Sequence, residues 1–226
     1  MPSSAPVSTP IASAPAEREP VNGWFHFAGA LLSALALAWL AADAAGRHSP
    51  RYLLGVAVFG CSALCMFSAS ALYHLRPRSR HAPIFRRLDH AMIYAFIAGT
   101  YTPICLIVLW PGRTGIVLLS AVWTLAIAGV VVNLLGRQLP RGVATTVYLG
   151  LGWAALPVVP RLFAHPGMGT WLLAGGLFYT VGALVYWMKR PFGRPGVLGF
   201  HELWHLCVLA ASASHFWAIK AYVLPL

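Results

Sequence analysis

Seven long apolar segments, separated by short polar or Pro/Gly-rich breaks, constrain this chain more than any other feature. A transmembrane helix needs about 20 consecutive, mostly apolar residues. Because lipid offers no hydrogen-bond partners, backbone that crosses a bilayer must form helices or a closed barrel. Runs this long and uniformly apolar predict an all-α membrane protein, a bundle of seven transmembrane helices. The expected spans cover residues 24–42, 52–75, 88–109, 114–135, 143–163, 169–188 and 200–223.

The composition excludes a soluble protein. Only 9% of the 226 residues are charged and 59% are hydrophobic, whereas a soluble domain carries about 25% charged residues. We expect one membrane domain over residues 21–226, preceded by a disordered tail, rich in Pro, Ser and Ala, over residues 1–20. Within the bundle, we expect Pro157 and Pro160 to kink or shorten the fifth helix, because proline lacks a backbone N–H.

The distribution of basic residues predicts the orientation in the membrane. With seven crossings, the two termini lie on opposite sides. The side of the N-terminus carries eleven of the sixteen basic residues. Because loops rich in Lys and Arg face the cytoplasm, we expect a cytoplasmic N-terminus and a C-terminus outside. The net charge of +11 then belongs to loops at an anionic membrane face, and we expect no nucleic-acid partner.

Ionisable side chains in the spans gather at the cytoplasmic level. His74 ends the second span and Asp89 opens the third, while His201 and His205 open the seventh. Such residues are costly in a membrane unless they have a partner or a function. Two His residues four apart share one face of a helix. A third His would complete a site that suits zinc and leaves a fourth position for water. Interfacial polar histidines would have the same spacing, so both explanations stay open.

Asp89 and Ser70 are the candidates for chemistry beside such a metal. Asp89 could bind the metal, orient a ligand or accept a proton from the water. Ser70 lies four residues before His74 and shares its helix face. A competing motif is H-E-x-x-H at residues 201–205, in which Glu202 would be the general base of a zinc protease. In that alternative, Asp89 or His74 supplies the third ligand.

Sequence motifs resemble those of the bacterial hemolysin III family, in the right order and across nearly the whole chain. This family belongs with the progestin and adipoQ receptors (PAQR) and, more distantly, with the alkaline ceramidases. The motifs are EPVNGWFHFAG (residues 19–29), SALYH (70–74), LDH (88–90), IAGTYTP (97–103) and GFHELWH (199–205), followed by His215 and Phe216.

The resemblance implies a zinc ion near the inner leaflet of a bacterial plasma membrane. The zinc ligands of the related receptors match His74, His201 and His205. The residue that matches Asp89 lies beside the metal and is thought to act on or through its water, and Ser70 matches the serine of the relatives' Ser-x-x-x-His pattern. Glu202 is not part of the relatives' motif, which disfavours the protease.

We therefore expect a zinc-dependent hydrolase of a lipid amide or ester, with a membrane lipid as its partner. Two other functions stay open: a sensor of membrane lipids in which zinc is structural, and a pore-forming cytolysin. A pore needs a continuous polar path, whereas the span interiors contain few polar residues besides Asn133 and His215. The oligomeric state does not follow from the sequence.

Overall fold

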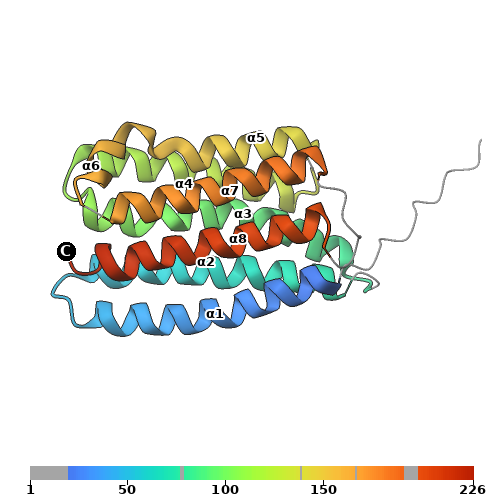
Figure 1. The fold of residues 1–226 in the computed structure, drawn as a ribbon, viewed down its shortest axis with the longest axis horizontal. Coiled ribbons are helices and arrows are strands. Elements are labelled where there is room, and N and C mark those ends of the chain that lie inside the picture. Colours follow the sequence, from blue (N-terminus) through green and yellow to red (C-terminus); the bar gives the residue numbers. More distant parts are fainter. Residues whose placement is uncertain (1–19, 77–78, 138, 166, 191–197) are drawn as a thin grey trace, which may run out of the picture.

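Seven helical spans form the described part of the chain. The structure is a computed structural model, and it describes residues 20–76, 79–137, 139–165, 167–190 and 198–226. Within these residues, seven helical segments are long and apolar enough to cross a membrane, and they run along one another in a single bundle (Figure 1). The predicted seven-helix fold is confirmed, and the chain is a multi-pass membrane protein. The tail predicted over residues 1–20 lies outside the described residues, except for Pro20.

Four of the spans are single helices, and three are composite. The third and seventh spans each end in a π-helical turn, η1 (Ile104–Val108) and η3 (Ile219–Val223). The fifth combines α5 (Arg141–Gly152), a 3-10 segment η2 (Trp153–Val158) and α6 (Val159–Phe163). The remaining helices are α1 (Pro20–Ala45), α2 (Pro50–Leu75), α3 (Ala82–Pro103), α4 (Arg113–Leu134), α7 (Met168–Met188) and α8 (Phe200–Ala218).

Prolines interrupt the fifth span, as expected. Pro157 lies inside the 3-10 segment η2, and Pro160 stands in the first turn of α6. Each proline lacks a backbone donor and has a fixed φ angle, which disfavours regular α-helix on the side that precedes it. As a result, the α-helix of this span ends at Gly152 and starts again only at Val159.

The third helix begins earlier than hydrophobicity indicates. We expected it to start at residue 88, but α3 begins at Ala82 and includes Arg86 and Arg87. Two arginines in the second turn are compatible with a membrane helix, because long basic side chains near a helix end can reach the polar interface. As a consequence, Asp89 lies about two turns inside α3 rather than at its start.

The helices pack in a closed arrangement. Helix α1 packs against α2, α2 against α3, and α3 against α4, while α8 packs against both α7 and α1. In the apolar stretch of the third span 61% of the residues are buried, the largest share among the seven spans. In α4 and in the fifth span the share is only 17%. Large apolar side chains, among them Leu35 and Val117, are exposed on the outside of the bundle. Lipid is the solvent that such a surface requires.

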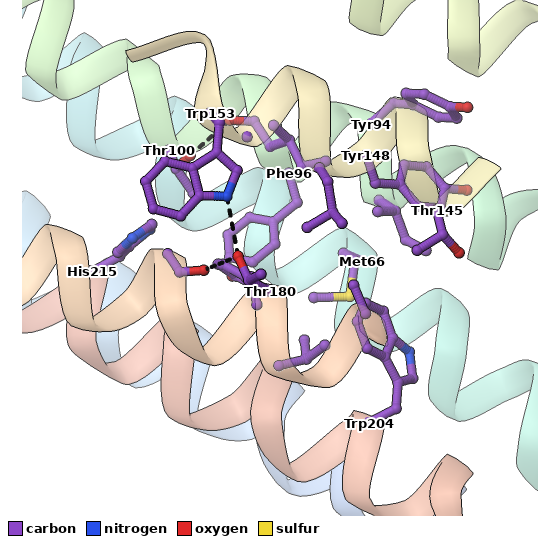
Figure 2. Close-up of a pocket in the computed structure, with 18 of the residues that line it drawn as sticks. Met66, Tyr94, Phe96, Thr100, Thr145, Tyr148, Trp153, Thr180, Trp204 and His215 are labelled. Atoms are coloured by element: carbon purple, nitrogen blue, oxygen red, sulfur yellow. Dashed lines mark hydrogen bonds between the residues drawn. The ribbon is translucent and has the colours of Figure 1, made fainter. Parts of the chain in front are cut away.

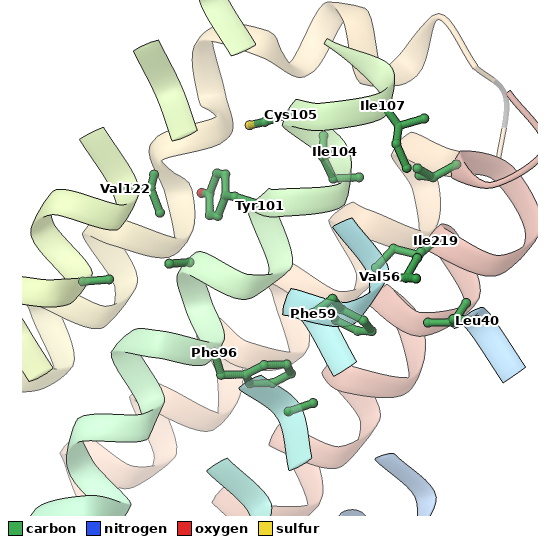
Figure 3. Packing of buried hydrophobic residues seen from close by; sticks show 14 of the residues in the cluster. Leu40, Val56, Phe59, Phe96, Tyr101, Ile104, Cys105, Ile107, Val122 and Ile219 are labelled. Atoms are coloured by element: carbon green, nitrogen blue, oxygen red, sulfur yellow. The ribbon is translucent and has the colours of Figure 1, made fainter. Parts of the chain in front are cut away.

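A hydrophobic core of buried side chains lies among α1, α2, α3, α8 and η3. Figure 3 shows side chains from these elements packed together, among them Leu40, Val56, Phe59, Phe96 and Ile219. Each of these five is at most 3% exposed. Packing at this density leaves little freedom for the backbone. The core therefore holds α2 and α8, which carry the candidate site, at fixed positions beside α1 and α3.

Candidate metal centre

Three histidines from two helices meet at the end of the bundle where α1 begins. One ligand nitrogen each from His74, His201 and His205 lies within 4.8 Å of the others. The ring centroid of His74 is 5.0 Å from those of His201 and His205, and the latter two are 4.8 Å apart. His74 and His205 are buried and His201 is half-buried. The structure thus brings together the three histidines that were candidate metal ligands in the sequence.

Local sequence explains why α8 presents its two histidines at this level. Helix α8 begins immediately after Gly199, and the backbone N–H of Gly199 donates a hydrogen bond to Oε2 of Glu202 at 2.9 Å. The amide Nδ2 of Asn22 on α1 donates to Oε1 of the same carboxylate at 3.5 Å. Glu202, only 2% exposed, therefore caps α8 and links it to α1.

This role of Glu202 weighs against the protease motif. The general base of H-E-x-x-H must face the metal together with the two histidines. Glu202 instead lies against the N-terminus of α8 and Asn22 of α1. Both oxygens of its carboxylate already accept hydrogen bonds at the helix terminus, so a structural role explains this side chain.

Asp89 and Ser70 line the same cavity as the three histidines. Ser70 is 1% exposed and lies one helical turn before His74. The Asp89 side chain is 14% exposed, and its carboxylate lies 3.6 Å from Nδ1 of His90. The same nitrogen of His90 lies 2.9 Å from the carbonyl oxygen of Arg86. Asp89 thus lies on the cavity wall, outside the ligand group found among the described residues.

A cavity of about 980 Å³ runs from the histidine cluster along the inside of the bundle. It reaches Leu162 and Phe163 of α6, at the opposite end. Its walls are mostly apolar, and Figure 2 shows Met66, Phe96 and Trp204 around it. Polar groups halfway along the cavity have hydrogen-bond partners within the protein. Nε1 of Trp153 donates to Oγ1 of Thr180 at 3.0 Å. Nε2 of His215 lies 3.3 Å from the carbonyl oxygen of Leu172. The volume lies at the upper end of the range for ligand sites.

The sequence assigned no role to two residues at the polar end of this cavity. The guanidinium of Arg141 lies 4.5 Å from the ring centroid of Tyr186, whose ring is 5.6 Å from that of His201. In the sequence, Arg141 is one of many basic residues between spans, and nothing there distinguishes it. His26 is a second such residue. Its ring centroid lies 3.8 Å from that of His205.

Comparison with known proteins agrees with this architecture. The model of the family described as "Haemolysin-III related" matches residues 15–216. The chain belongs to this family. This haemolysin III protein is 36% identical to Hemolysin-3 of Bacillus cereus over 212 residues, which cover 92% of this chain and 93% of the relative. It is also 36% identical to the Hemolysin-3 homolog of Bacillus subtilis over 209 residues, 91% and 94% of the two chains.

More distant relatives of this haemolysin III protein extend to the adiponectin-receptor type. The heptahelical transmembrane protein ADIPOR3 of Oryza sativa subsp. japonica is 30% identical over 201 residues, which cover 78% of this chain and 48% of the relative. The predicted relation to the hemolysin III family and to the PAQR superfamily is confirmed.

Proposed function

We propose that this protein is a zinc-dependent hydrolase of a lipid amide or ester in a bacterial plasma membrane. The observation that carries the proposal is the position of the three-histidine cluster at one end of a long, mostly apolar cavity. An acyl chain matches the apolar walls. The polar bond at the head of that chain would then lie beside the histidines and Asp89.

The residues at the cluster fit a zinc ion. His74, His201 and His205 would hold it, because three imidazole nitrogens are a donor set that catalytic zinc sites use. Their ligand nitrogens already lie within 4.8 Å of one another, so small side-chain movements complete the site. When bound, zinc in such a site polarises a carbonyl group and activates water.

The other residues supply binding and proton transfer. The carboxylate of Asp89 would accept the proton of the attacking water, and the hydroxyl of Ser70 would donate a hydrogen bond to the polar head of the substrate. Apolar side chains along the cavity, such as Phe96 and Ile97, would hold the acyl chain and exclude water. Membrane lipid is the partner that this arrangement supports.

Metal analysis of the purified full-length protein, together with hydrolysis assays on a lipid panel, tests the proposal. We expect about one zinc ion per chain and release of a fatty acid from at least one amide or ester lipid. His201→Ala should abolish zinc binding, because two nitrogens are too few ligands. Full zinc retention after replacement of His74, His201 and His205 together by Ala would contradict the assignment.

The name of the Bacillus cereus relative, Hemolysin-3, favours membrane lysis as a second candidate. In this chain the candidate ligands and Asp89 lie at one end of the cavity and most of its walls are apolar, which suits a lipid better than a conducting path. Dye leakage from liposomes without zinc would support lysis. Bound zinc without turnover of any lipid would support a sensor with structural zinc.

A further inference from the structure

His26 on α1 is a buried histidine that the proposed chemistry does not use. It is 3% exposed, and neither of its ring nitrogens has a hydrogen-bond partner in the part of the chain that the structure describes. A neutral imidazole carries one N–H donor and one acceptor nitrogen. Leaving both without partners inside a protein is unfavourable, so this side chain requires an explanation.

The neighbouring ring, that of His205, also has a nitrogen without a hydrogen-bond partner among the described residues. This nitrogen is Nδ1, which is also buried. The two ring centroids lie 3.8 Å apart, with an angle of 45° between the ring planes. The other ring against His26 is that of Phe67, at 5.0 Å, and it carries neither nitrogen nor oxygen. His205 therefore offers His26 a polar partner where Phe67 cannot.

We infer that His26 is the hydrogen-bond partner that orients His205 for the metal. A histidine that binds a metal through one nitrogen usually donates a hydrogen bond from the other, which fixes its tautomer and ring orientation. At a centroid distance of 3.8 Å the two rings contact each other through their faces. Both side chains must rotate, and the rings must move apart, before Nδ1–H of His205 can donate to a ring nitrogen of His26 with ordinary hydrogen-bond geometry. Nε2 of His205 is then the nitrogen that faces the metal. This inference rests on the zinc site of the proposed function.

Helix α1 is well placed for this role. Asn22 and His26 are four residues apart on one helix face, and both are buried. Asn22 donates to Glu202, and His26 contacts His205 one turn further along α8. Helix α1 thus holds α8 at two successive levels. His26 is a positioning residue and not a ligand, because the group of ligand atoms within 4.8 Å of one another, among the described residues, does not include it.

Zinc affinity of the purified full-length protein in detergent tests the role of His26, measured by competition with a chelator of known affinity. His26→Leu fills the same space without an acceptor, and we expect its zinc affinity to fall about 10- to 100-fold, as for other hydrogen-bond partners of metal ligands. His26→Gln keeps an acceptor oxygen and should recover most of the loss. His215→Leu is the matched control, because it removes a half-buried histidine deeper in the cavity and should leave zinc affinity unchanged.

The outcomes separate this inference from the proposed function. If the wild-type protein binds zinc and His26→Leu binds it equally well, the role of His26 is wrong while the zinc site stands. If His26→Gln loses as much affinity as His26→Leu, packing and not hydrogen bonding explains the effect, and the inference is also wrong. If the wild-type protein binds no zinc, the proposed function falls and this inference with it. Thermal unfolding of each variant confirms that it is folded.

Discussion

Asp89 is a carboxylate on the wall of the cavity that also contains the three histidines. If the Asp89 carboxylate accepts the proton of the attacking water, the Asp89→Asn variant should keep the side-chain shape and the bound zinc but lose turnover. General-base assistance is typically worth about 10²–10⁴-fold, and we expect a loss in that range. Zinc content and lipid hydrolysis should be measured on the same preparation. Wild-type turnover in Asp89→Asn would contradict the assignment.

Glu202 provides the contrasting case, because its hydrogen bonds give it a structural role. Glu202→Gln retains an oxygen that can accept from the N–H of Gly199, so we expect near-normal zinc content, turnover and stability. Glu202→Ala removes the acceptor and should destabilise the fold by about 1–3 kcal/mol, measured by unfolding in detergent. An inactive but stable, zinc-loaded Glu202→Gln would instead support the protease alternative.

At the scale of helices, close approach of α7 to α8 depends on Gly175. A Cβ at this position would collide with the His215 ring and lie 3.1 Å from the carbonyl oxygen of Ala211. Because this backbone oxygen is held by its helix, Gly175→Ala should destabilise the protein by about 1–3 kcal/mol. Gly150→Ala in α5 is the matched control, since a Cβ there meets nothing within 4 Å. Equal thermal stability of both variants would contradict this account of the α7–α8 contact.

The number and order of helices could be predicted because apolar segments of this length have one stable form in lipid. Helix parity and the four-residue spacing of His201 and His205 placed His74, His201 and His205 at one membrane level, and the resemblance to the related receptors selected these three as the group. The start of α3 could not be predicted from hydrophobicity, because Arg86 and Arg87 in its second turn interrupt the apolar pattern. The contact of His26 with His205 and of Arg141 with Tyr186 depends on how α1 and α5 pack against distant helices. Sequence periodicity within one helix carries no information about that packing.

At the scale of the whole molecule, the asymmetry of charge predicts the orientation. The described residues at the end of the bundle with the histidine cluster include eight Lys and Arg side chains, and those at the opposite end include five. By the positive-inside rule, a reporter fused after Leu226 should lie outside the cytoplasm, and one fused before Met1 should lie inside. A protease-protection or enzymatic reporter assay on cells distinguishes the two sides. A cytoplasmic signal from the C-terminal fusion would contradict the orientation.

The pairing of α1 with α8 bears on how the protein is made. A ribosome delivers α1 to the membrane first and α8 last, yet Asn22, His26 and His74 each contact a residue of α8. Until synthesis ends, the early helices must remain in lipid without these contacts. If zinc binds at the proposed site, it can be captured only after α8, which carries His201 and His205, has entered the bundle. In a nascent or truncated chain the first three spans would be substrates for membrane quality control, and zinc capture would mark the completed molecule.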